Sequence, residues 1–147
     1  MGEASTPKAT IVVPVYNSAS SIQRCLDSLL AQSERSIQVV CVNDGSADDS
    51  LRVLRQIAQT DDRVLVIDQK NAGVSCARNA GIDAAGGEVV FFVDADDYID
   101  AQTVERVLHA MGSSDAEVAV FGGVCEPADA APKRVQQLMS PNAGTFG

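Results

Sequence analysis

Residues 10–46 read TIVVPVYNSASSIQRCLDSLLAQSERSIQVVCVNDGS, and the spacing of their apolar side chains decides the fold. The β-branched run at 10–15 predicts a strand, with Pro14 near its end, where a missing N–H is tolerated. Apolar residues at 22, 25, 26, 29 and 30 then have the spacing of an amphipathic helix. Residues 37–42 are apolar except for one glutamine, as in a strand covered on both faces. The stretch therefore predicts a strand–helix–strand unit.

The same alternation continues along the chain. Further strands are expected at 64–67, 88–93 and 118–124, and further helices at 51–58, 74–85 and 104–111. This order predicts an α/β fold with a mostly parallel sheet and helices on both faces. Gly81 is a poor helix former on the inner face of its helix, which predicts a close approach to the sheet. The pattern fails from residue 126, so residues 1–125 are expected to form the domain and 126–147 a loop or loose tail.

Composition narrows the class of protein. The 147 residues carry 11 basic and 20 acidic side chains, a net charge of −9, so the chain lacks the basic footprint of a nucleic-acid binder. No tract approaches the roughly 18 apolar residues of a membrane span, and residues 1–10 do not resemble a signal peptide. A cytoplasmic location is expected, and peripheral attachment to the inner face of the membrane is compatible with it. The cysteines lack Cys-x-x-Cys spacing and are interpreted as reduced core residues.

Polar side chains follow the first four predicted strands. Because open α/β sheets bind ligands outside the carboxyl ends of their strands, these residues are candidates for one site. Asp94 and Asp96 follow a very apolar strand, and such a pair can share a divalent cation while substrate phosphates complete its shell. The alternative is a solvated turn that caps the next helix.

Three other positions have a similar pair of interpretations. Asp44 can accept a hydrogen bond from a nucleobase N–H, or cap the following helix together with Ser46. Tyr16 can pack against a base, or be an ordinary half-buried aromatic residue. Arg78, with Lys70, can meet phosphate oxygens, or form a surface ion pair.

Five segments resemble the family 2 glycosyltransferases in order and spacing, over about residues 9–124. They are residues 12–17 (VVPVYN), 25–30 (CLDSLL), 43–48 (NDGSAD), 71–81 (NAGVSCARNAG) and 92–97 (FVDADD). The resemblance implies a GT-A, Rossmann-like fold, a nucleotide-diphosphate-sugar donor and a cation, Mn²⁺ or Mg²⁺. A UDP-sugar is the favoured donor, and a glycan or lipid-linked molecule is the expected acceptor. One departure is Asn43, where the family often has a second aspartate.

The resemblance also implies roles for single residues. Pro14, Tyr16 and Asn17 would line the nucleotide pocket, and Asp44 would read the base. Asp96 would be the direct metal ligand, with Asp94 beside it. Asn71, Gly73 and Arg78 would lie beside the nucleotide and its diphosphate, and Lys70 is expected with them. Ala95 is expected with Asp94 in the region of the ribose and the metal.

The end of the chain departs from the family's pattern. Inverting transfer needs a general base to deprotonate the acceptor hydroxyl, and the family's base comes from a later segment. The chain is therefore expected to be a truncated, donor-binding half without the acceptor half. The favoured function is metal-assisted sugar transfer to an acceptor hydroxyl with inversion, and the alternative is nucleotide-sugar binding without turnover. A phosphatase is disfavoured because its acidic motif would follow the first strand, and a dehydrogenase because residues 14–21 contain no glycine.

Overall fold

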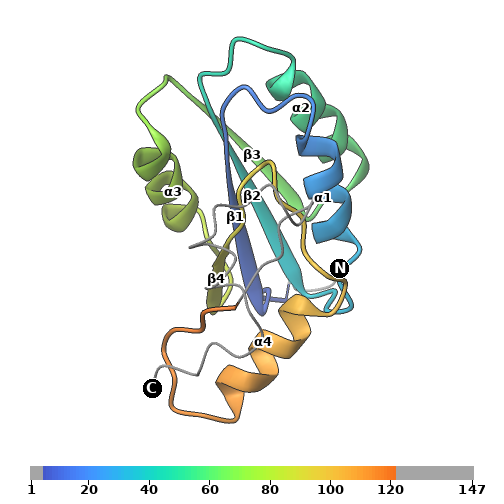
Figure 1. The fold of residues 1–147 in the computed structure, drawn as a ribbon, viewed down its shortest axis with the longest axis vertical. Coiled ribbons are helices and arrows are strands. Elements are labelled where there is room, and N and C mark those ends of the chain that lie inside the picture. Colours follow the sequence, from blue (N-terminus) through green and yellow to red (C-terminus); the bar gives the residue numbers. More distant parts are fainter. Residues whose placement is uncertain (1–4, 122–147) are drawn as a thin grey trace, which may run out of the picture. The chain divides into compact units, whose positions relative to one another are not determined.

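The computed structural model describes residues 5–121, and a parallel sheet lies at its centre (Figure 1). In the described residues the sheet has four strands in the order β3-β2-β1-β4. All three pairings are parallel, and Val39 of β2 aligns with Ile11 of β1 and Val64 of β3. The prediction of a parallel sheet is confirmed. The strands are β1 (Ala9–Val15), β2 (Ile37–Asp44), β3 (Val64–Gln69) and β4 (Val89–Phe92).

Helices cover both faces of this sheet, as predicted. Helices α1 (Ile22–Leu30), α2 (Ser50–Thr60) and α4 (Thr103–Gly112) share one apolar cluster with the first face. Helix α3 (Val74–Asp83) packs on the other face, where Ala77 meets Val40 and Val42. Figure 1 shows α1 and α2 on one side of the strands and α3 on the opposite side.

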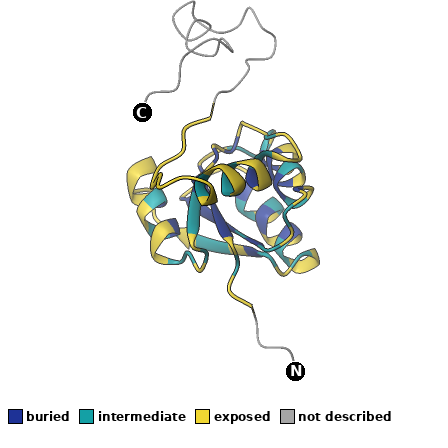
Figure 2. Ribbon diagram, turned by 90° about the horizontal axis from the view of Figure 1, so that it is seen from below, coloured by how far each residue is buried: buried dark blue, intermediate teal, exposed yellow. Residues whose placement is uncertain are grey.

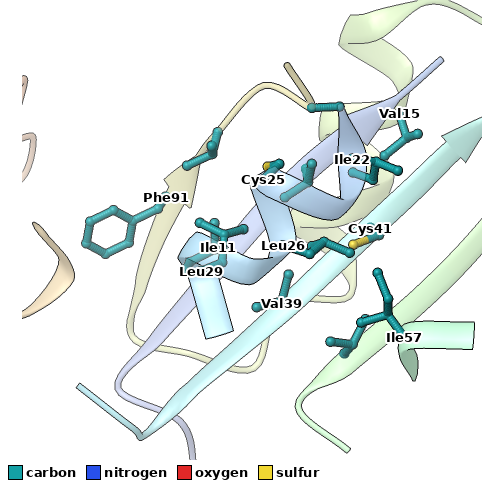
Figure 3. Close-up of a cluster of buried hydrophobic side chains, with 14 of the residues drawn as sticks. Ile11, Val15, Ile22, Cys25, Leu26, Leu29, Val39, Cys41, Ile57 and Phe91 are labelled. Carbon is teal, nitrogen blue, oxygen red and sulfur yellow. The ribbon is translucent and has the colours of Figure 1, made fainter. Parts of the chain in front are cut away.

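The larger core lies between β1, β2 and α1 (Figure 3). Ile11, Leu26 and Val39 are fully buried there, and each such aliphatic side chain stabilises the fold by roughly 1.5–3 kcal/mol. Strands β1 and β2 are almost entirely buried, whereas β3 and β4 are partly exposed, and the helices and loops carry most of the other exposed residues (Figure 2). The polar residues at the carboxyl ends of these strands form the candidate site.

The close approach predicted at Gly81 is confirmed. A Cβ atom at this position would lie 2.3 Å from Cγ1 of Val12 in β1, a distance that real Cβ contacts essentially never show. Glycine therefore lets α3 sit directly on the sheet. This contact sets the distance between α3 and the sheet.

Two predictions need correction. Residues 118–121 form no strand, and the rest of the strand predicted at 118–124 lies outside the described residues. An apolar pattern shows that a segment suits a strand, but a strand also needs a neighbour to bond its backbone groups. Cys25 and Cys41 are buried as expected, whereas Cys76 is exposed on α3 and Cys125 lies outside the described residues.

Residue contacts divide the chain into one unit at Met1–Ala110, which holds the sheet, and a second at Met111–Gly147. The loop or tail predicted at 126–147 lies outside the described residues, and the domain boundary at 125 stays a prediction.

Candidate functional site

A cavity of about 760 Å³ opens at the edge of the sheet where the carboxyl ends of the strands meet. Its wall comes from the loop after β1, the end of β2, the loop between β3 and α3, the first turns of α3 and the turn after β4. This is the edge at which open α/β sheets bind ligands. The lining residues are Pro14, Val15, Tyr16, Asn17, Ser18, Ser20, Ser21, Asp44, Asn71, Gly73, Val74, Ala77, Arg78, Asp94, Ala95 and Asp96.

The cavity brings the expected donor-site residues together, with the exception of Lys70. Lys70 is exposed in the loop before Asn71 and is not among the lining residues. Sequence reasoning missed Val74, which is 50% exposed at the cavity, because its position suited the apolar stripe of a helix. It also missed Ser20 and Ser21, whose only signal was their place in the same strand-to-helix loop as Asn17.

Residues 94–97, the acidic turn after β4, are held in place by hydrogen bonds to the backbone of Asp94. The N–H of Asp97 donates to the carbonyl of Asp94 at 3.0 Å, and the thiol of Cys25 approaches the same carbonyl at 3.6 Å. Helix α4 does not begin until Thr103, and the N–H of Gln102 is bonded by the Asp100 carboxylate instead. Asp94 and Asp96 are thus solvent-exposed, as the alternative expected, but their turn does not cap the next helix.

Negative charge accumulates in this turn. Burial, followed by the charges of Asp96 and Asp94, raises the pKa of Asp97 above its usual value. Burial and the same three carboxylates raise the pKa of Cys25 to about 12, so its thiol is protonated at neutral pH. A cation bound here would relieve this repulsion.

The side chain of Arg78 lines the cavity and carries a positive charge next to this turn. Its Nη2 atom donates to Oδ1 of Asp94 at 3.0 Å, so the ion pair considered for it does form, inside the cavity. Its Nε atom is buried without a hydrogen-bond partner. Arg78 therefore retains an unsatisfied donor group next to the acidic turn.

Asp44, at the end of β2, also lines the cavity and is only 3% exposed. Its Oδ1 accepts hydrogen bonds from Gln69 Nε2 and the N–H of Ala72, both at 2.8 Å, and its Oδ2 accepts one from the N–H of Gly73 at 2.9 Å. These bonds, above all the one from Gln69, hold the pKa of Asp44 below its usual value. Asp44 thus supports the start of α3 rather than capping α2.

Asn17 joins the loops that follow β1 and β2. It adopts a positive φ of 48°, and its Oδ1 accepts a hydrogen bond from the N–H of Ala47 at 2.8 Å. Nearby, the N–H of Ala19 donates to Asp48 at 3.0 Å. Asp48 and Asp49 directly precede α2, with Asp49 as its N-cap.

The side chains of the cavity that could bind a metal ion offer oxygen atoms as ligands. In the part of the chain that the structure describes, no three His, Cys, Asp or Glu side chains cluster as a complete metal site. Asp94 and Asp96 supply a carboxylate pair, which suits a hard cation whose shell is completed by ligand phosphates and water. Among the helices of residues 5–121, none has both the length and the apolar character needed to cross a bilayer.

Comparisons with known proteins relate this chain to glycosyltransferases. A model of the family described as glycosyl transferase family 2 matches residues 10–145. Glycosyltransferase GlyA of Streptococcus pneumoniae is 42% identical over 113 residues, which cover 77% of this chain and 16% of that protein. The putative glycosyltransferase EpsH of Bacillus subtilis is 42% identical over 107 residues, which cover 73% of this chain and 31% of that protein.

Solved structures agree with these matches. TarS from S. aureus in complex with UDP-GlcNAc superposes with a TM-score of 0.67 at 32% identity, over 72% of this chain and 31% of TarS. The mannosyltransferase PcManGT from Pyrobaculum calidifontis, in complex with GDP-Man and Mn²⁺, gives a TM-score of 0.63 at 28% identity, over 71% of this chain and 31% of that one. This chain thus spans about a third or less of the length of the proteins it matches.

Proposed function

The chain belongs to glycosyl transferase family 2, and on that premise we propose that its cavity binds a nucleotide-diphosphate sugar for transfer to an acceptor hydroxyl. The observation that carries the proposal is the convergence of Asp44, Arg78 and the acidic turn at 94–96 on one cavity. These groups come from the end of β2, from helix α3 and from the turn after β4, so only the folded chain unites them. Their chemistry matches a base, a diphosphate and a cation, respectively.

The nucleotide would lie along the walls formed by β1, β2 and α3. Tyr16 is 54% exposed and offers a ring face to the base, with Pro14 and Asn17 beside it, while Asp44 offers a carboxylate oxygen to a base N–H. The diphosphate would lie near Asn71, Gly73 and the first turn of α3, where N–H groups and the helix dipole favour an anion. A UDP-sugar is the donor favoured by the likeness to TarS in complex with UDP-GlcNAc.

Asp96, with Asp94, would hold Mn²⁺ or Mg²⁺ against the diphosphate. When bound, the cation supplies charge neutralisation for the departing nucleoside diphosphate. PcManGT, which was crystallised with GDP-Man and Mn²⁺, supports this assignment. In this arrangement Arg78 orients the Asp94 carboxylate through their 3.0 Å contact, and Ala95, which is 5% exposed, anchors the turn in the core.

Transfer with inversion requires a base that takes a proton from the acceptor hydroxyl. Asp44 is bonded to the backbone, and Asp94 and Asp96 are committed to the cation, so none of these carboxylates suits that task. We therefore place the base and the glycan or lipid acceptor site outside the cavity described here. Donor binding without turnover is the second candidate, and it is favoured because none of these carboxylates suits the role of the base. A cytoplasmic location, at the inner face of the membrane, would suit such a donor.

The test is a thermal unfolding series with UDP and Mn²⁺. At a hundredfold excess over the dissociation constant, bound UDP is expected to raise the melting temperature by about 10 °C, because only the folded state binds it. Asp96→Ala is expected to abolish the metal-dependent part of the rise, while Asp62→Ala, which removes an exposed charge elsewhere, retains it. The absence of any metal-dependent rise with UDP or GDP in the unaltered chain would refute donor binding.

A second assay separates the two candidates. UDP release from UDP-GlcNAc, with and without an added acceptor sugar, measures turnover directly. Release above the rate of the Asp96→Ala variant would reject the binding-only candidate, and binding without release would support it.

A further inference from the structure

Gln69 lies just outside the cavity, yet it contacts a residue that lines the cavity. It is the last residue of β3 and aligns with Asp44 in the parallel register, so both side chains point to the same face of the sheet. Its Nε2 donates to Oδ1 of Asp44 at 2.8 Å. A buried carboxylate needs such donors, because transfer from water is costly unless its oxygens are hydrogen-bonded.

The other donors to Asp44 come from the loop that starts α3. The N–H groups of Ala72 and Gly73 point at the two oxygens of the carboxylate, and Gly73 is the N-cap of α3. Gly73 has a φ of +92°, which favours glycine, although a Cβ there would meet nothing within 4 Å. Backbone conformation, and not lack of space, therefore requires this glycine.

The loop also packs closely against the residue after Asp44. Gly45, directly after Asp44, lies so close to Asn71 that a Cβ on it would stand 2.7 Å from the Asn71 N atom. Residues 71–73 thus contact both the Asp44 carboxylate and Gly45, the residue that follows it. The same loop supplies Asn71 and Gly73 to the cavity wall.

We propose that Gln69 is a positioning residue, which fixes the Asp44 carboxylate and through it the 71–73 loop in the conformation that accepts a nucleotide. The proposal rests on the proposed function for its binding consequence, but the loop contact itself does not. Without the amide donor, the carboxylate retains two backbone bonds and gains freedom to rotate. The other charged groups of the cavity are Arg78, Asp94 and Asp96, of which Arg78 already pairs with Asp94.

The test compares Gln69→Glu with Gln56→Glu, which adds the same charge at an exposed site on α2. Two carboxyl groups at hydrogen-bond distance cannot both ionise freely, so one pKa rises. At low pH the introduced carboxyl is protonated and donates to Asp44 in place of the amide; as pH rises it loses that proton and repels Asp44. We expect UDP with Mn²⁺ to bind both variants alike at pH 5.5, and Gln69→Glu about tenfold more weakly at pH 8.

A ligand-free readout keeps this test separate from the proposed function. Amide hydrogen exchange at Ala72 and Gly73 is expected to accelerate about tenfold in Gln69→Glu at pH 8 and in Gln69→Leu at any pH, relative to Gln56→Glu. If UDP fails to bind the unaltered chain, the proposed function falls and the exchange rates still decide the role of Gln69. Should Gln69→Glu fail to fold, Gln69→Leu carries the exchange test. Unchanged exchange in the folded variants, or a binding ratio that does not vary with pH, would overturn the proposal.

Discussion

Gly81 shows how a single residue sets the distance between two layers. Most helix positions tolerate a methyl group, but at this one the methyl would overlap Val12 in the central strand. Glycine costs the helix up to about 1 kcal/mol in propensity relative to alanine, so its presence here is explained by the packing. Helix α3 carries the cavity residues Val74, Ala77 and Arg78, and their position therefore depends on this contact.

We predict that Gly81→Ala lowers the free energy of unfolding by about 1–3 kcal/mol, because the added methyl forces α3 away from the sheet. Urea denaturation measures the change. Gly112→Ala is the matched control, since a Cβ there meets nothing within 4 Å, and no loss is expected from it. Equal stability of the two variants would contradict the packing explanation.

At the scale of elements, helix α1 holds the segment that leads from the acidic turn to α4. Gln32, just beyond the end of α1, is fully buried although it is polar. Its Nε2 donates to the carbonyl of Asp100 at 2.7 Å, and its Oε1 accepts from the N–H of Val104 at 3.0 Å. Ser28 adds a bond from the N–H of Ile99 at 3.2 Å. This side-chain bridge fixes a connection that has no regular structure of its own.

Gln32→Leu is expected to lower the free energy of unfolding by about 2–3 kcal/mol. The leucine fills the space but leaves the Val104 N–H without its partner, while the Asp100 carbonyl retains only the bond from the N–H of Thr103. Thermal unfolding followed by circular dichroism gives the value, with Gln59→Leu on the exposed face of α2 as the control. A loss no larger than that of the control would show that these backbone groups find other partners.

At the scale of the whole molecule, the acidic side chains make stability depend on pH. Hydrogen bonds and basic neighbours lower the pKa of Glu34, Asp44 and Asp61, with Lys8, Gln69 and Arg63 as their respective main partners. A carboxyl group with a lowered folded-state pKa stabilises the fold above its unfolded pKa, and this contribution disappears as pH falls through the folded value. The raised pKa of Asp97 acts in the opposite sense and offsets part of this effect.

We therefore predict little change in stability between pH 7 and pH 5, and a steep loss below about pH 4, where these carboxylates take up protons. Urea midpoints at pH 7, 5 and 3.5 test this, and Asp61→Asn is expected to flatten the low-pH part of the profile. A midpoint that is constant down to pH 3.5 would show that these groups have ordinary pKa values in the folded state.

The sequence by itself determined the order of strands and helices, the parallel sheet and the strand ends at which polar residues gather. These follow from local periodicity and turn residues, which each segment carries regardless of its neighbours. It also indicated the close packing at Gly81. The strand predicted at 118–124 is wrong for its described part, residues 118–121, because pairing depends on a neighbour that no local pattern reveals.

Only the tertiary structure decided which polar side chains form hydrogen bonds within the protein. Asp44 is bonded to Gln69 and to the start of α3, Asn17 ties two loops together, and Gln32 bridges to α4. Their partners lie 25 to 72 positions away along the chain. Hydrogen bonds act over about 3 Å in space, and the fold alone brings such distant residues within that reach.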